Sequence, residues 1–414
     1  MNIRLAVICL AAASVGLSIV IVSVSKLLLF LTGLVWLLAP RQNSADSPLR
    51  RLKSTPVAVI GVLMAMAFSL MWTTAPDSDA YGSLAKYGKL LSILILFLLI
   101  KTRRDALCAV GAFFMAQCFL VASSWLLFAD VALPWATSNM AATEYAVFSS
   151  YLDQGIISAL FAVLCWHLRE LIPGRHGRLL GVLLAVLTLC NVFFVLRGRT
   201  GHVVAIALIS LAVMWELPSR YRLAAVLAPF VLVFALAAGS DKLRERLSLV
   251  STEVQSYSSQ QVTTTSSGIR LGLWSSSIQM IGQHPWVGTG VGSWSTEYNL
   301  LQRHKNPLHK DIRGNFNPHG EYLLWGVQLG VAGILIFVLM LSAVIADARR
   351  MHKNEARAVW SSVAALAIAS LFNSSLYDAF IGDFFCIVIG LLLALGSHPA
   401  AHPAPEKLPS KANL

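Results

Sequence analysis

The chain has 414 residues, of which 57% are hydrophobic and only 13% are charged, and its formal net charge is +12. Its mean hydropathy is +0.69. Soluble domains average about 45–50% apolar and about 25% charged residues, so this composition excludes an ordinary soluble globular protein. The positive charge is spread over short loops between apolar runs, which argues against a nucleic-acid-binding domain. The chain is therefore predicted to be a polytopic membrane protein.

The apolar runs indicate helices rather than barrel strands. They match the length needed to cross a bilayer, and they lack the alternation of polar and apolar residues that an outer-membrane strand would show. The sequence thus predicts an all-α polytopic membrane protein with about 12 transmembrane helices. The predicted spans are residues 5–17, 19–38, 55–73, 88–100, 105–127, 150–167, 178–196, 202–217, 223–239, 322–346, 358–374 and 380–396.

The first two spans leave two interpretations open. The run from Leu5 to Leu38 is long for one straight span and short for two. It could form a tight hairpin, or a single tilted helix with Lys26 near one end. No small-residue cleavage signature followed by a soluble domain is evident, so we do not expect a removed signal peptide.

The predicted spans divide the chain into four parts. Residues 1–239 hold about nine transmembrane helices, and residues 322–396 hold three more. Between them, residues 240–321 form one large polar loop that is expected to contain short helices. The Pro-, Ala- and Lys-rich residues 397–414 are expected to be a disordered cytoplasmic tail.

The distribution of Lys and Arg predicts the orientation. Lys and Arg are concentrated in alternate short loops, which are therefore expected to face the cytoplasm. The large loop 240–321 then lies on the outer side of the membrane, and basic residues there suggest an anionic ligand such as a diphosphate lipid. The basic short loops are residues 40–54, 101–104, 168–177, 218–222 and 347–357.

Two arginines are predicted at the outer ends of neighbouring spans. Arg197 and Arg199 lie in a link so short that their guanidiniums would be held at the membrane surface. A guanidinium is planar and stays charged, so it can bind phosphate oxygens with two parallel hydrogen bonds. The alternative is that both side chains reach up to lipid phosphates, as many arginines at helix ends do.

The large loop has internal organisation. Residues 241–250 are amphipathic and predict a surface helix, whereas residues 251–267 are rich in Ser, Thr and Gln and are expected to be mobile. Helical spacing resumes after Gly268 and places Arg270 at the start of another helix. The apolar positions of that helix are Leu271, Trp274, Ile278 and Ile281, and Gly282, His284 and Pro285 are expected to end it.

A Gly-rich run follows from Trp286 to Trp294. Its glycines permit tight turns and would allow the backbone to approach a ligand closely. The alternative is that they only fold the loop onto the helix bundle. No strand precedes the run, so a nucleotide-binding loop is excluded.

His319 is the strongest candidate for a catalytic residue. Asn317 can cap the next helix and Pro318 suits its first position, which would place His319 in the first helical turn. A helix N-terminus disfavours an imidazolium and attracts anions, so we expect His319 to be a neutral base beside an anion site. A histidine that only caps the helix or hydrogen-bonds at the interface is the alternative.

Metal and cofactor sites are not expected. The six cysteines form no CxxC pair, which argues against a disulfide framework or a cysteine metal site. Asp77 and Asp79 resemble the carboxylate pairs that hold divalent metal in some membrane glycosyltransferases, and we keep them as a minority alternative. Asp378 and Asp383 flank the last outer turn and could orient a histidine or a basic side chain.

Two segments of the chain resemble the O-antigen ligase/polymerase superfamily. The resemblance rests on the arginines of residues 197–202 and on motifs within residues 268–323, and the number of helices and the late outer loop agree with it. The matching residues of the second segment are Arg270, Trp274, Ile281, His284, Pro285, Gly288, Thr289, Gly290, Pro318, His319, Gly320, Glu321, Tyr322 and Leu323.

This resemblance implies a membrane-embedded, GT-C-like glycosyltransferase that inverts the anomeric centre and uses no metal or cofactor. The donor would be a glycan linked to undecaprenyl diphosphate, and the acceptor the lipid A core oligosaccharide. Superfamily members that use another lipid-linked repeat or a protein hydroxyl as acceptor are the alternatives.

The resemblance also implies roles for residues. His319 would be the base that activates the acceptor hydroxyl, and Arg270 with Arg197 or Arg199 would bind the diphosphate. Tyr322, Glu321 and Trp274 would be supporting residues of the site.

A transporter of an anionic solute is the alternative from another class of protein. Such a protein is expected to carry ionisable residues near the bilayer midplane. The chain offers few, since Lys26 and Asp153 both lie toward the ends of predicted spans. The sequence therefore favours the glycosyltransferase.

Overall fold

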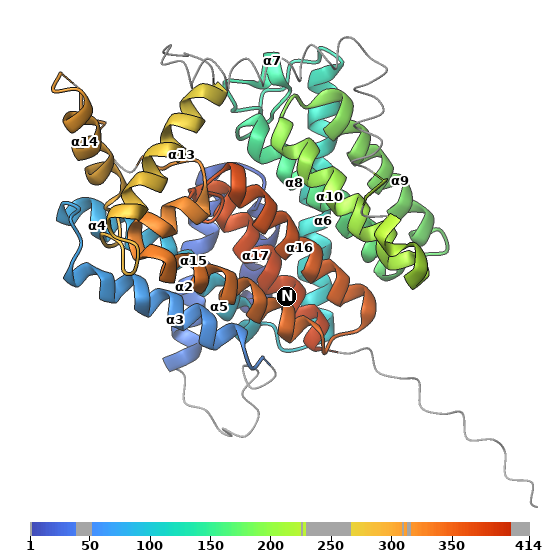
Figure 1. Cartoon of the computed structure of the whole chain (residues 1–414). Coiled ribbons are helices and arrows are strands. Elements are labelled where there is room, and N and C mark those ends of the chain that lie inside the picture. Colours follow the sequence, from blue (N-terminus) through green and yellow to red (C-terminus); the bar gives the residue numbers. More distant parts are fainter. Residues whose placement is uncertain are drawn as a thin grey trace, which may run out of the picture.

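The computed structural model of the chain describes residues 2–38, 52–224, 227–228, 266–308, 310–312 and 316–398. These residues form a bundle of helices and contain no β-strand (Figure 1). Within them, eight helices are long and apolar enough to cross a membrane. The prediction of an all-α polytopic membrane protein is therefore confirmed.

The predicted spans correspond to helices throughout the described part of the chain. The span predicted at 223–239 lies almost wholly outside the described residues, as does the predicted surface helix 241–250. The helices of the N-terminal part are α1 (Ile3–Ser14), α2 (Ile19–Leu38), α3 (Thr55–Phe68), α4 (Asp77–Tyr87), α5 (Leu91–Leu99), α6 (Arg103–Phe128), α7 (Ala141–Glu144), α8 (Tyr151–His167), α9 (Gly177–Cys190) and α10 (Arg199–Glu216). They are followed by α13 (Ser266–Gln283), α14 (Trp294–Lys305), α15 (Glu321–Ala348), α16 (Lys353–Phe372) and α17 (Ala379–Ser397).

The first apolar run forms a hairpin. Helices α1 and α2 contact each other across a turn at Gly16, and the Ser14 and Ser25 hydroxyl oxygens lie 2.7 Å apart between them. The alternative of one tilted helix is therefore wrong. Lys26 points into the bundle, where its Nζ lies 2.5 Å from Oδ2 of Asp383 on α17.

The predicted span 88–100 begins eleven residues too late. Asp77–Leu99 forms one apolar unit made of α4, a short 3-10 turn and α5. Asp77 and Asp79 occupy the first turn of α4, not the polar loop predicted for them. Carboxylates in a first turn face the positive end of the helix dipole, which explains why the polar Asp-Ser-Asp sequence starts a helix.

Helix α17 lies at the centre of the bundle. Its apolar window is 94% buried, the highest share of any candidate span in the described part of the chain. It contacts α5, α6, α8 and α16, while α3 and α13 contact α15 (Figure 1). The elements that carry the candidate site are therefore held by a common core.

Ion pairs join the helices at one end of the bundle. Arg4 pairs with Asp105, Arg103 with Glu355, and Arg357 with Glu216, each at 2.7 Å. These pairs include residues of loops that the sequence predicts to face the cytoplasm. Arg199, Arg270 and His319 gather at the other end, which we call the His319 face.

The Gly-rich run folds onto the bundle, as the second interpretation of its glycines predicts. Gly290 has φ +90°, and a Cβ atom there would lie 2.4 Å from Cα of Thr73. Thr289 N–H donates to the Val327 carbonyl oxygen at 2.9 Å, and Thr74 N–H donates to the Thr289 carbonyl oxygen at 3.0 Å. The run thus joins the start of α4 to α15.

Helix α15 is interrupted where this run meets it. Gly330 has non-helical angles (φ 66°, ψ −159°), and the Val331 N–H donates instead to the Pro285 carbonyl oxygen at 2.7 Å. Helix α14 then follows the run from Trp294, a helix that the sequence did not predict. Most residues of α14 are polar, so its sequence does not show the regular spacing of apolar residues that predicts a helix.

Candidate functional site

His319 lies in a turn before α15, not in the first turn of the helix. The helix begins at Glu321, with Gly320 as its extended N-cap residue, and His319 has the left-handed φ of +52°. The predicted capping by Asn317 is therefore wrong. A non-glycine residue with positive φ cannot continue a helix, and such residues persist only where surrounding contacts hold them.

Three side chains hold the His319 turn in place. Asn317 Oδ1 accepts the His319 N–H at 2.9 Å and the Ser374 hydroxyl at 2.9 Å. Trp274 Nε1 on α13 donates to the His319 carbonyl oxygen at 3.3 Å. The turn is thereby tied both to α13 and to the link between α16 and α17.

The link between α16 and α17, residues 373–378, is itself anchored by buried charges. Glu321 is fully buried, and its Oε2 accepts the N–H groups of Leu376 at 2.8 Å and Tyr377 at 3.1 Å. Lys89 Nζ donates to the Asp378 carbonyl oxygen at 2.6 Å. Because both anchors bind backbone, they fix the path of this link.

Asp378 at the end of this link faces the His319 turn. Its Oδ1 accepts a hydrogen bond from Asn317 Nδ2 at 3.2 Å. Burial raises the pKa of the Asp378 carboxyl, while the charges of His319, Lys89 and Lys86 oppose this shift. The expectation that Asp378 could stand beside a histidine thus agrees with the structure.

The imidazole of His319 is shifted toward its neutral form. Burial lowers the pKa of His319, and the positive charge of Arg270 lowers it further. Asp378 and a hydrogen bond with Asn373 raise the pKa and partly offset these effects. The expected neutral base is thus consistent with the structure, but the cause is burial and a neighbouring cation, not a helix N-terminus.

Arg270 connects His319 to the start of α10. Burial lowers the pKa of the Arg270 guanidinium, the phenol of Tyr151 raises it, and the charge of Arg199 lowers it. Arg270, Arg199 and Tyr151 are therefore within electrostatic reach of one another, although they come from three helices. Because the positive charges of Arg270 and Arg199 lie close together, they form a site suited to bind an anion.

The glycines around Arg199 explain its position. The Cβ atom that a side chain would add at Gly201 would lie 2.8 Å from Cα of Gly155, so α10 and α8 approach closely at their first turns. Such an approach is possible only without side chains at the contact. Gly198 also lies against α8, since a Cβ atom there would lie 3.0 Å from the Tyr151 carbonyl oxygen, and Arg199 next to it is exposed.

Arg197 lies farther out than Arg199. Its side chain is 64% exposed, and its Nε lies 3.9 Å from Oε2 of Glu144 on α7. The groups that shift the pKa values of Arg270 and His319 include Arg199 and Arg270 but not Arg197. Of the two arginines predicted to bind a diphosphate, Arg199 is thus the one that the structure brings to Arg270.

The three predicted supporting residues support the site in different ways. Trp274 holds the His319 backbone, as described above. Glu321 is buried and anchors residues 373–378, so it cannot touch a substrate. Tyr322 donates its hydroxyl to the Ala367 carbonyl oxygen at 3.2 Å, which fastens α15 to α16.

The residues that the structure describes contain no group of three or more His, Cys, Asp or Glu side chains arranged to hold a metal ion. Asp77 is exposed and Asp79 is half-buried at the start of α4. Asp79 acts electrostatically on Lys86 and Tyr377. Among the described residues, no third His, Cys, Asp or Glu side chain joins Asp77 and Asp79 to complete the metal site that we kept as a minority alternative.

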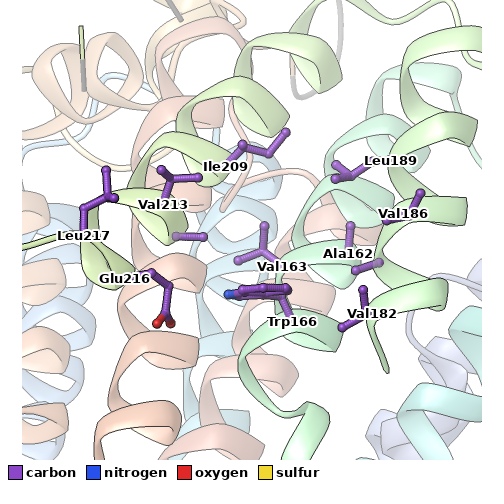
Figure 2. Close-up of a pocket in the computed structure, with 12 residues that line it drawn as sticks. Ala162, Val163, Trp166, Val182, Val186, Leu189, Ile209, Val213, Glu216 and Leu217 are labelled. Atoms are coloured by element: carbon purple, nitrogen blue, oxygen red, sulfur yellow. The ribbon is translucent and has the colours of Figure 1, made fainter. Parts of the chain in front are cut away.

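An apolar pocket of about 280 Å³ lies between α8, α9 and α10. Figure 2 shows Trp166 of α8 between Val182, Val186 and Leu189 of α9 and Val213 of α10, with Glu216 at its edge. Glu216 is the last residue of α10, and Arg199 is the first. The pocket therefore lies at the other end of α10 from the charged residues and is not part of their site.

One family of known proteins matches the part of the chain that carries most of these residues. Residues 183–338 match the family model described as O-Antigen ligase. This stretch of the chain is thus similar to the O-antigen ligase family. It carries Arg197, Arg199, Arg270 and His319, whereas Asp378 lies beyond it. No match was found among the curated proteins.

The sequence missed several residues of this site. Tyr151, Asn373 and Ser374 lie far from the two segments that resemble the O-antigen ligase family, and nothing in their local pattern sets them apart. Asn317 was assigned to a helix cap rather than to the His319 turn. Of the site residues outside the two segments, only Asp378 is indicated by the sequence, through its position at the last outer turn.

Proposed function

We propose that the chain is an inverting, metal-independent glycosyltransferase that transfers O-antigen glycan from undecaprenyl diphosphate to the lipid A core oligosaccharide. The observation that carries this proposal is the grouping of one histidine with two arginines. His319 has a lowered pKa beside Arg270, and Arg270 lies within electrostatic reach of Arg199. The family match supports transfer of a lipid-linked glycan as the general chemistry.

Arg270 and Arg199 would bind the diphosphate of the donor. As the bond between the anomeric carbon and the diphosphate oxygen breaks, negative charge builds on the leaving diphosphate. Fixed guanidiniums stabilise such charge, and removing one positioned donor of this kind typically costs about 10²–10³ in rate. Because these cations can neutralise the leaving group, the reaction we propose requires no metal ion.

His319 would take the proton of the acceptor hydroxyl. A base must be neutral to accept a proton, and burial together with the charge of Arg270 favours the neutral imidazole. The hydroxyl oxygen forms the new bond to the anomeric carbon on the face opposite the diphosphate, which inverts that centre. The proton goes to His319 and the electron pair leaves with the diphosphate.

We further propose that the protein lies in the bacterial inner membrane with the His319 face toward the periplasm. The basic short loops that the structure describes support this orientation, because they lie at the opposite ends of the helices. These loops are residues 101–104, 168–177, 218–222 and 347–357. The polyprenyl tail of the donor would stay in the bilayer while its diphosphate reaches the start of α10.

A purified-protein assay tests this function. The donor is the glycan on undecaprenyl diphosphate, and the three acceptors are lipopolysaccharide truncated to its core, a second lipid-linked repeat and a protein with exposed hydroxyl groups. The same protein is also reconstituted in vesicles to measure solute movement. We expect glycan to appear on the truncated lipopolysaccharide. Product only on the lipid-linked repeat would indicate a polymerase, product only on a protein acceptor would indicate a protein O-oligosaccharyltransferase, and solute movement across vesicles without a new bond would indicate a transporter.

Metal removal tests the chemistry of the same reaction. We expect EDTA to leave the initial rate unchanged, because guanidiniums, not a cation, are proposed to stabilise the leaving diphosphate. Added Mg²⁺ or Mn²⁺ should not raise the rate. A rate that EDTA abolishes and Mg²⁺ restores would contradict the metal-independent mechanism.

A further inference from the structure

A polar cleft of about 320 Å³ lies between the start of α4 and helix α14. Its volume is at the lower end of the range of small-ligand sites, which is about 300–1,000 Å³. Six of its nine lining residues have polar or charged side chains. The lining residues are Pro76, Asp79, Ser295, Thr296, Asn299, Leu300, Arg303, Asp311 and Ile312.

One wall of the cleft is fixed by its own hydrogen bonds. Asn299 Nδ2 donates to the Ile312 carbonyl oxygen at 2.8 Å, and Asn299 Oδ1 accepts the Ile312 N–H at 2.9 Å. Arg303 Nε donates to Asp311 Oδ1 at 2.8 Å. These pairs join α14 to Asp311 and Ile312, so this wall is held by contacts within the protein itself.

Two polar groups of the cleft are candidates to bind a ligand. No described residue forms a hydrogen bond with the Asp79 carboxylate or with the Thr296 hydroxyl, and both side chains are half-buried. A carboxylate accepts up to four hydrogen bonds, and a hydroxyl can donate one as well as accept. Neighbouring hydroxyl groups, such as those of a sugar ring, suit this pair.

The cleft is adjacent to the His319 turn. The Ser295 hydroxyl donates to the Phe316 carbonyl oxygen at 3.5 Å, and the Phe316 ring lies edge-on to the His319 ring at 6.3 Å. Arg270 and Arg199 reach His319 from α13 and α10 instead. In Figure 1, α4 and α14 lie on one side of α13, and α8 and α10 lie on the other.

We propose that this cleft binds a sugar residue of the acceptor glycan, with Asp79 and Thr296 holding its hydroxyl groups. The inference rests on the proposed function. In an inverting transfer the acceptor approaches the anomeric carbon from the side opposite the leaving group. A diphosphate at Arg199 and Arg270 and an acceptor sugar in the cleft would meet this requirement, with His319 between them. The ligand class is an oligosaccharide at the membrane surface, from lipopolysaccharide core or from a lipid-linked repeat.

Steady-state kinetics of Asp79→Asn test the cleft. Loss of hydrogen bonds to a charged group should raise the KM for the acceptor about tenfold, with the KM for the donor and kcat unchanged. Asp77→Asn is the matched control, because Asp77 is exposed in the same helical turn but does not line the cleft. Running both glycan acceptors identifies which glycan source the cleft prefers.

Two kinetic results would overturn the proposal. One is an unchanged acceptor KM in Asp79→Asn and in Thr296→Ala. The other is a rise in the donor KM as large as the rise in the acceptor KM, which would place the donor glycan in the cleft.

A binding measurement separates this inference from the proposed function. Core oligosaccharide freed from its lipid is titrated into the detergent-solubilised protein, with ligand-observed NMR as the readout. We expect binding by the wild-type protein and by Asp77→Asn, and at least tenfold weaker binding by Asp79→Asn. Binding without any glycan transfer would remove the proposed function but keep the cleft, whereas equal binding by all three proteins would remove the cleft.

Discussion

The protonation state of His319 depends on the groups that surround it in the folded chain: burial and Arg270 favour the neutral imidazole, and Asp378 opposes them. The sequence predicts a neutral base because it places His319 in a helix N-terminus, yet the residue lies in a turn with φ +52°. Burial and Arg270 lower its pKa instead. Residue types and spacing could locate His319 and Arg270, but not Tyr151 or Ser374, whose proximity depends on helix packing.

Removing the charge of Asp378 tests whether His319 is the base. Asp378 raises the pKa of His319, so Asp378→Asn should lower that pKa while keeping an oxygen that can accept from Asn317. In the proposed mechanism, activity requires neutral His319 and falls as the pH falls through its pKa. We therefore expect the acid limb of the kcat/KM profile to move to lower pH, with a smaller effect on the plateau.

The wild-type profile sets the reference for this test. Because the pKa of His319 is lowered, the wild-type acid limb should lie below about pH 6.5, the ordinary value for histidine. An acid limb that does not move in Asp378→Asn, or that moves to higher pH, would show that His319 is not the titrating base.

Among the secondary-structure elements, the membrane-spanning helices could be predicted from the sequence, whereas the helices of the outer loop could be predicted only in part. Apolar runs of membrane length predict most of the helices. In lipid, the backbone N–H and C=O groups of such a run must be hydrogen-bonded within the protein, and a helix does this within one segment. Helix α13 followed from the spacing of its apolar residues, whereas α14 did not, because its sequence is mostly polar. The path of the Gly-rich run depends on contacts with residues 73 and 327–330, which no local pattern encodes.

Gly290 tests whether the Gly-rich run is structural. Its φ of +90° and the 2.4 Å approach of a Cβ atom to Thr73 leave no room for a side chain. Gly290→Ala should lower the free energy of unfolding by about 1–3 kcal/mol, the cost of a strained backbone conformation. The midpoint of thermal unfolding in detergent measures this effect.

Gly282→Ala is the matched control for that substitution. Gly282 lies in α13, and a Cβ atom there would meet no atom within 4 Å. Alanine in a helix is favoured over glycine by about 1 kcal/mol, so this variant should be as stable as the wild type or slightly more stable. Equal midpoints for both variants would mean that the run does not need its observed conformation.

At the scale of the whole molecule, the bundle buries more charge than the sequence indicated. Lys89, Glu321 and Asp383 are all buried, and Lys26 pairs with Asp383. The sequence predicts few ionisable residues inside the spans, and the structure contains more of them than predicted. Lys89 and Glu321 bind backbone of residues 373–378, so these two charges hold the His319 face together. Hydropathy averages conceal such isolated residues within apolar windows.

The two faces of the bundle predict opposite accessibility in cells. Ser78 lies exposed at the start of α4 on the His319 face, and Arg350 lies exposed after α15 at the opposite end. A membrane-impermeant maleimide should label Ser78→Cys in cells with a permeabilised outer membrane, and Arg350→Cys only after lysis. Labelling in the reverse order would place the His319 face in the cytoplasm and contradict the proposed periplasmic reaction.

The initial rate of glycan transfer by purified His319→Ala measures the role proposed for His319. His304→Ala is the control, since His304 is exposed on α14 and does not line the cleft. With both variants folded, we expect His319→Ala to lose about 10²–10⁴ in rate, the usual contribution of a general base, and His304→Ala to keep the wild-type rate. A wild-type rate in His319→Ala would contradict the proposed role of His319 and, with it, the assignment of this face as the active site.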